Sequence, residues 1–324
     1  MEENDFGGTI VDTEAKTHIF IDDKKKALIR QIFSVDIDSD LFDPRYDYVA
    51  KRILTAENPK SKQALIDLIN SSLKLVGGET VVDLTVINSE LPVDSKNYKK
   101  SRFDIRARFQ NGEQGIIEME WGKKDNFKKR SQLIISKAYS DQDINNKTYN
   151  DLKRCYLICI VDYTLFEGDN DYFRDGMFRD AKGTPITDDQ IIIFLELSKI
   201  AGLLEKPVAD LTDIECWLLF FKYATDKSKR DMLNKIIERE EGVSMATQIL
   251  QTISKEERER SLYQSQLIYE LDQRSEKESA VKKAKLEAKL EAKLEIARNL
   301  KLKNIPIDVI SETTGVPLDE VAAI

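Results

Sequence analysis

The chain has 324 residues, of which 41% are hydrophobic and 33% charged, and its formal net charge is −8. This composition is typical of a globular protein with a strongly solvated surface, and no apolar run is long enough to predict a membrane span. The single histidine, His18, stands in a polar leader, so we expect neither a catalytic triad nor a histidine zinc site. No glycine-rich phosphate-binding motif is present. Carboxylates, lysine, tyrosine or a metal ion would have to carry any catalysis.

The three cysteines indicate the compartment. Cys155, Cys159 and Cys216 form no CxxC pair, and an odd, sparse set is typical of a reducing environment. Residues 1–17 contain no apolar signal core. We therefore expect a cytoplasmic protein that does not enter a membrane.

The first part of the chain predicts an irregular extension followed by two helices. We expect residues 1–40 to be the extension, with one short helix at Lys24–Phe33. From Phe42, apolar residues recur at helical spacing. Ser61 is a candidate cap for a second helix, which the pair Gly77-Gly78 ends.

The middle of the chain predicts an α/β domain. The candidate strands are Val81–Ile87, Arg102–Phe109, Gln114–Trp121, Cys155–Asp162 and Ile191–Leu197, and the candidate helices are Asn126–Asp141 and Glu215–Tyr223. The run Cys155–Asp162 is almost continuously apolar, as in a strand that is buried on both faces. This order of strands and helices indicates a mixed central sheet flanked by helices.

The last part of the chain predicts a helical arm. A four-residue repeat, KLEA, places Leu286, Leu290 and Leu294 on one narrow stripe, which favours a partner helix or self-association over a core position. Two short helices follow, broken at Thr314–Pro317, and the last one has no basic residue, which favours packing over DNA reading. We divide the chain into an extension (1–40), an α/β domain (41–235), a helical arm (236–304) and a helix-turn-helix-like tail (305–324).

A basic island interrupts this acidic chain. Residues 96–130 contain eleven Lys or Arg and five Asp or Glu, a local charge of +6, so the remainder carries −14. Such an island is typical of a polyanion site, although a solvated charged face has the same composition.

The register of the central hairpin follows from burial. Pairing Phe103 with Met119 and Ile105 with Ile117 puts the apolar side chains of both strands on one face. The connection is then a three-residue loop that ends in Gly112, in the left-handed conformation.

The same register places Asp104 directly opposite Glu118. Like charges in this position destabilise a hairpin, unless one carboxyl is protonated or a cation lies between the two. A hard cation such as Mg²⁺ takes carboxylate oxygens, water and substrate phosphate, which fits phosphodiester hydrolysis. An ordinary strand face with scattered charges is the alternative.

Six segments resemble a known family in their sequence and order. They are FDPRYDYVAKRIL (42–54), ALIDLINSSL (64–73), KKSRFDIRA (99–107), NGEQGIIEMEW (111–121), the Arg-then-Tyr segment 130–139 and the closing helical stretch 297–321. Together they resemble the recombination-promoting nuclease and putative transposase family of the PD-(D/E)XK superfamily. The resemblance implies a restriction-endonuclease-like α/β core followed by a mostly α-helical C-terminal region.

The resemblance also implies a metal-dependent DNA endonuclease. Asp104 and Glu118 would be catalytic metal ligands for Mg²⁺, or alternatively Mn²⁺, with the carbonyl of Met119 completing the set. Glu120, the third candidate catalytic residue, stands where the superfamily has Lys and this family usually has Gln. Since Glu120 cannot supply positive charge, a degenerate fold that binds DNA or a protein partner is the alternative. A coiled-coil scaffold based on the tail is a third reading.

The same resemblance implies DNA as the binding partner. The candidate DNA contacts are Arg102, Arg106, Lys128, Lys129 and Arg130, although a solvated helix face would explain the last three equally well. The register also places Arg102 across from Glu120, where the two could form an ion pair. We further expect a homo-oligomer through the C-terminal helix. Recombination, transposition and phage defence are all compatible roles.

Overall fold

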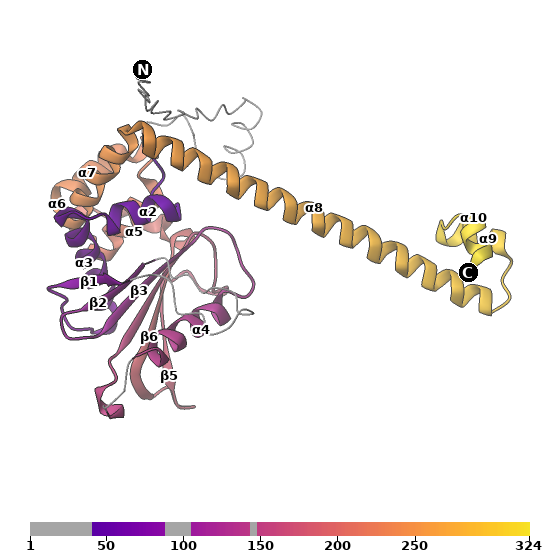
Figure 1. Ribbon diagram of the computed structural model, residues 1–324, viewed down its shortest axis with the longest axis horizontal. Coiled ribbons are helices and arrows are strands. Elements are labelled where there is room, and N and C mark those ends of the chain that lie inside the picture. The colour runs from indigo at the N-terminus through magenta and orange to yellow at the C-terminus, as the bar shows by residue number, and fades with distance from the viewer. Residues whose placement is uncertain (1–40, 88–104, 143–147) are drawn as a thin grey trace, which may run out of the picture. The chain divides into compact units, whose positions relative to one another are not determined.

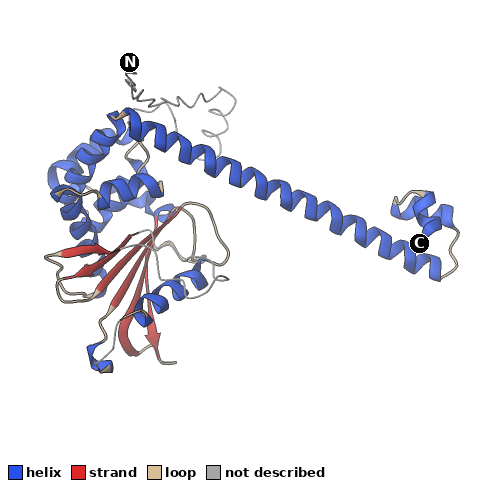
Figure 2. Cartoon of the chain, in the orientation of Figure 1, coloured by secondary structure: helices blue, strands red, loops and turns tan. Residues whose placement is uncertain are grey.

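One six-stranded mixed sheet organises the protein (Figures 1 and 2). The computed structural model describes residues 41–87, 105–142 and 148–324. The strands are β1 (Leu84–Ile87), β2 (Ile105–Phe109), β3 (Gln114–Glu120), β4 (Cys155–Val161), β5 (Phe173–Arg179) and β6 (Pro185–Glu196). They lie in the order β1-β2-β3-β4-β6-β5; β3, β4 and β6 are mutually parallel, and the other neighbours are antiparallel.

Helices flank the sheet and make up the C-terminal part of the chain. They are α2 (Asp47–Thr55), α3 (Pro59–Leu73), α4 (Phe127–Ser140), α5 (Asp213–Tyr223), α6 (Arg230–Arg239), α7 (Glu241–Lys255), α8 (Glu257–Leu302), α9 (Ile307–Thr314) and α10 (Leu318–Ala323). The predicted fold class, a mixed sheet between helices followed by a helical region, is confirmed. The helix predicted at Lys24–Phe33 lies outside the described residues.

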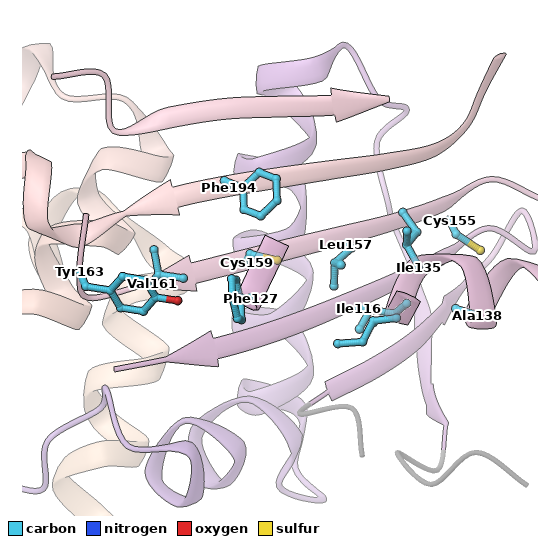
Figure 3. Close-up of a cluster of buried hydrophobic side chains, with 11 residues drawn as sticks. Ile116, Phe127, Ile135, Ala138, Cys155, Leu157, Cys159, Val161, Tyr163 and Phe194 are labelled. Atoms are coloured by element: carbon cyan, nitrogen blue, oxygen red, sulfur yellow. The ribbon is translucent and has the colours of Figure 1, made fainter. Parts of the chain in front are cut away.

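Strand β4 is the centre of the core. All seven of its residues are buried, as its continuous apolar sequence predicts. One face of the sheet and helix α4 share a hydrophobic cluster (Figure 3), whose members are Ile116, Phe127, Ile134, Ile135, Ala138, Cys155, Leu157, Cys159, Val161, Tyr163 and Phe194. On the opposite face of β3, Ile69 of α3 lies next to Gly115. Both faces of the central strands are therefore covered.

The hairpin register derived from burial is confirmed for the described residues. Ile105 pairs with Ile117, and both side chains are buried together with Met119. The loop has three residues: the N–H of Phe109 donates to the carbonyl of Glu113 at 2.8 Å, and Gly112 has a φ of 86°. Phe103, the predicted partner of Met119, lies outside the described residues.

Two elements begin at other residues than the sequence predicts, because of hydrogen bonds to side chains. Asn58, and not Ser61, caps α3: its Oδ1 accepts the backbone N–H of Ser61 at 2.9 Å, and Pro59 takes the first helical position. The first strand begins at Leu84 rather than Val81. The backbone N–H and carbonyl of Val81 both bind the side chain of Asn70, each at 2.8 Å, so they are not available to a strand neighbour.

Strand β5 was not predicted. Its sequence, FRDGMFR, has no clean alternation of apolar and polar residues, and its side chains are half-buried or exposed. It lies at the edge of the sheet, where one side of the strand has no neighbour among the described strands. The partner strand β6 thus defines β5 more strongly than the sequence of β5 does.

The C-terminal part divides from the rest. The chain forms two compact units, Met1–Tyr263 and Gln264–Ile324, and helix α8 runs through the boundary. Within the second unit, α9 and α10 pack on α8 through a small cluster of Ala297, Ile310, Val316 and Val321. The two predicted short helices are confirmed, while the boundaries at residues 40, 235 and 304 stay predictions.

The leucine stripe of α8 is partly exposed. Leu286 and Leu290 are 70% and 49% exposed, and Leu294 packs against the terminal cluster. The described helices include none that is long and apolar enough to cross a membrane.

Gly115 is predicted to tolerate no side chain. A methyl group there would lie 2.7 Å from Cζ of the Phe109 ring, which is itself buried. We expect Gly115→Ala to lower the free energy of unfolding by about 1–3 kcal/mol, measured by urea denaturation. Gly202→Ala is the matched control, since nothing lies within 4 Å of the added carbon, and it should leave stability unchanged. Equal midpoints for the two variants would contradict this packing.

The exposed stripe predicts that the tail serves association. Deleting the chain from Ser275 onward should leave a folded, soluble α/β domain that self-associates less than the full chain. Circular dichroism and sedimentation velocity would measure the two effects. An insoluble truncated protein would place the tail in the core and contradict the predicted division.

Candidate functional site

An ion-pair cluster with a buried carboxylate, Glu118, lies on the α4-covered face of β3. One guanidinium nitrogen of Arg130 donates to Glu118 Oε2 at 2.8 Å, and the other donates to Glu120 Oε2 at 3.2 Å. Lys124 also forms an ion pair with Glu120. Glu118 is only 1% exposed, so its charge is almost fully removed from water.

The alternation of β3 and the start of α4 build this cluster. Glu118 and Glu120 share a face with Ile116, because side chains two residues apart point the same way. Phe127 anchors the first turn of α4 in the hydrophobic cluster on that face, and this turn carries Arg130 over the two carboxylates. The alternative of an ordinary charged strand face therefore does not hold at Glu118, because α4 covers it.

The cluster can hold a cation. Two carboxylates that share one guanidinium are stable only while positive charge lies between them. A divalent ion would meet the same requirement for positive charge. Such an ion prefers oxygen ligands, and the carboxylates and the Met119 carbonyl are donors of that kind. The described residues contain no group of three His, Cys, Asp or Glu side chains that could hold a metal. Asp104, the predicted second ligand, lies outside the described residues.

Arg106 is not placed to contact DNA. Its side chain is 8% exposed, and the guanidinium donates twice to Gln114 Oε1, at 2.9 and 2.7 Å, and once to Asp141 at 3.3 Å. The alternation that suggested an outward-facing arginine is correct, but the face that it lines is covered. Arg106 therefore joins β2 to β3 and to the end of α4, and we withdraw it as a phosphate contact.

The other basic candidates differ in their surroundings. Lys128 and Lys129 are exposed on the first turn of α4, and the Lys128 ammonium lies 4.2 Å from the ring centre of Phe166. Arg130 is occupied by the two carboxylates in this state. Arg102 lies outside the described residues, so the Arg102–Glu120 ion pair stays a prediction. The observed partners of Glu120 are Lys124 and Arg130.

A second charged network adjoins the cluster and was missed by the sequence analysis. Arg45 pairs with Asp43 at 2.6 Å and with Asp162 at 2.7 Å, and Lys222 of α5 also pairs with Asp162. The backbone N–H of Asp162 donates to the carbonyl of Glu120 at 3.0 Å, which brings the network to the end of β3. Burial acts in the opposite direction, but the two aspartates raise the pKa of Arg45. The sequence signal for this network was Asp162, an aspartate directly after a strand that is predicted to be buried.

Comparison with known proteins identifies one family. The model of the PD-(D/E)XK nuclease family transposases matches residues 44–280, which include the whole sheet and the ion-pair cluster. No curated protein and no solved structure matches the chain at a significant level.

Arg130 is predicted to stabilise the fold through Glu118. Arg130→Met would leave a buried carboxylate without its cation, which destabilises strongly. Because the Arg130 side chain is 36% exposed and Lys124 remains beside Glu120, we expect a loss of about 1–3 kcal/mol in the free energy of unfolding. Lys129→Met, on the same turn but exposed, should change it by less than about 0.5 kcal/mol. Urea denaturation measures both free energies of unfolding. Equal losses in the two variants would contradict the pairing of Arg130 with Glu118.

Proposed function

The chain belongs to the PD-(D/E)XK nuclease family transposases, and on that premise we propose that it hydrolyses DNA phosphodiester bonds as a metal-dependent endonuclease. PD-(D/E)XK nucleases generally use divalent metal ions. The observation that carries the proposal is the cation position that the Arg130 guanidinium occupies between Glu118 and Glu120, at the strand positions that resemble the family's catalytic motif.

Glu118 is the proposed anchor of the metal site. Its burial lowers the local dielectric, so a cation beside it is bound more strongly than at the surface. The Met119 carbonyl is the proposed neighbouring oxygen ligand. In this proposal Arg130 leaves Glu118 when Mg²⁺ or Mn²⁺ binds, and the guanidinium, which is partly exposed, turns to a DNA phosphate.

Asp104 is the proposed second carboxylate ligand. It directly precedes Ile105, and Ile105 pairs with Ile117, the residue before Glu118. One further step of the same antiparallel register would bring Asp104 opposite Glu118. A metal ion shared by the two would then balance both charges.

The chemistry requires a water molecule and a proton acceptor. A bound divalent ion would polarise the scissile phosphate and make the attacking water more acidic. The water oxygen attacks phosphorus, its proton passes to the carboxylate of Glu120, and the bond from phosphorus to the leaving oxygen breaks. The leaving oxygen takes a proton from solvent. The side chain of Glu120 is more exposed than that of Glu118, which suits a group that exchanges protons with water.

Exposed lysines beside the cluster support DNA as the substrate. Lys128 and Lys129 lie on the turn of α4 that carries Arg130, within the basic island of the sequence. Contacts of this kind bind the phosphate backbone without reading the base sequence.

A binding module without catalysis is the second candidate. The observation that favours it is Glu120 itself: an acidic group stands where a lysine would orient the water and offset transition-state charge. Arg130 and Lys124 already neutralise the carboxylates here, so the fold does not need a metal ion for stability.

Cleavage should depend on the metal and on both proposed ligands. Asp104→Ala and Glu118→Gln should each abolish nicking of supercoiled DNA with Mg²⁺ or Mn²⁺, and the double variant should be no worse, because ligands of one metal act as a unit. Glu120→Gln, which removes the proposed proton acceptor, should lower cleavage. Glu113→Gln, a carboxylate at the turn end of the same hairpin, is the matched control and should cleave normally.

Three results would decide between the candidates. Cleavage that survives EDTA, or that is undiminished in Asp104→Ala, would exclude the metal mechanism. DNA binding by the wild-type protein without cleavage under either metal would establish the binding module instead. Circular dichroism of each variant separates lost chemistry from lost folding.

A further inference from the structure

Tyr163 has a buried hydroxyl group without a hydrogen-bond partner. Its side chain is 9% exposed, and among the residues that the structure describes, its hydroxyl is the one buried side-chain nitrogen or oxygen left unpaired. Tyr156 of β4 is the contrast: its hydroxyl accepts a hydrogen bond from Arg154 at 3.1 Å. Buried polar groups are nearly always paired, so the exception at Tyr163 calls for a physical reason.

The position of Tyr163 is that of the proposed site. Alternate residues of β4 up to Val161 face α4, and Tyr163 follows two residues later on the same face. Glu120 is the register partner of Val161. The Tyr163 ring lies edge-on to Phe127 at 6.4 Å between centroids, at one end of the cluster in Figure 3. The hydroxyl thus belongs to the same face and the same end of the sheet as the ion-pair cluster.

Stability does not explain the hydroxyl. A phenylalanine would make the same ring contacts with Phe127 and would not bury a polar oxygen without a partner. The group therefore costs stability in the DNA-free protein. Such a cost is typical of functional sites, where a polar group is oriented in advance for a ligand.

The surroundings determine what the hydroxyl can bind. Burial and the charge of Glu120 raise the pKa of Tyr163, so the group stays protonated and acts as a donor. The backbone N–H of Lys124 is a further polar neighbour, and it acts on the pKa of Tyr163 in the opposite direction. A donor hydroxyl near an acceptor carboxylate suits a water molecule, which can accept from one and donate to the other.

We propose that Tyr163 is a catalytic residue that donates a hydrogen bond to the oxygen of the attacking water, while Glu120 accepts a hydrogen bond from the same water. This rests on the proposed nuclease function. Glu120 in ionised form is only an acceptor and cannot orient the water as a lysine or glutamine donor does. Tyr163 supplies that donor from the bend that follows β4, so an acidic residue at position 120 is compatible with catalysis.

The test compares Tyr163→Phe with Tyr156→Phe in the full-length protein. Supercoiled plasmid with Mg²⁺ or Mn²⁺ gives kcat and KM for DNA, and thermal unfolding gives Tm. We expect Tyr163→Phe to lower kcat about tenfold or more, to leave KM unchanged and to leave Tm equal or higher, because the lost hydroxyl has no partner in the DNA-free protein. Tyr156→Phe, which loses its bond to Arg154 at the other end of β4, should show the reverse: a lower Tm and an unchanged kcat.

Each outcome separates this inference from the function on which it rests. Wild-type cleavage with an undiminished kcat in Tyr163→Phe would overturn the role of Tyr163 and leave the nuclease proposal standing. A fall in kcat accompanied by a lower Tm would assign the hydroxyl a structural role and also overturn the inference. No cleavage by the wild-type protein under either metal would overturn the proposed function, and the inference with it.

Discussion

The burial of Glu118 beneath helix α4 is the constraint on which the site depends. A carboxylate that is almost completely removed from water must have a cation beside it, and in this structure the cation is Arg130. The same guanidinium reaches Glu120, so the three side chains fix the first turn of α4 over β3. The position of α4 over β3 and the charge balance of the carboxylates are thus coupled. Any group that takes the place of Arg130 beside Glu118 has to be positively charged.

The ends of β3 and β4 carry most of the polar chemistry of the first unit. β4 itself is entirely apolar, but Asp162 follows it directly and binds Arg45 and Lys222. Its backbone N–H continues the ladder to Glu120 by one bond. Tyr163, the next residue, returns to the covered face. The apolar strand β4 therefore ends at a polar cluster.

The arrangement also explains how an acidic residue can stand at position 120. Lys124 and Arg130 surround it with positive charge, and in our proposal the Tyr163 hydroxyl, in the bend after β4, is the hydrogen-bond donor. The charge that a lysine would carry on β3 itself is thus distributed over the following loop and helix. Whether that distribution supports cleavage or only DNA binding is the chemical question that distinguishes the two proposed functions.

The sequence by itself determined the fold class, the central buried strand and the hairpin register. Each of these depends on a local pattern: a continuous apolar run at Cys155–Val161, and an alternation that leaves one register in which Ile105 meets Ile117. The position of Gly112 in the loop followed from that register. The order of the six family-like segments predicted the family that the comparison then showed.

Only the tertiary structure decided which polar side chains are buried and what they bind. Alternation put Arg106 and Glu118 on the polar face of the hairpin, but it cannot tell that α4 covers this face. Because α4 covers this face, Arg106 is a structural link and Glu118 is a buried carboxylate that pairs with Arg130. The strand β5 and the network around Asp162 were missed for the same physical reason. Each is defined by a partner, distant or nearby, and a periodic pattern contains no information about that partner.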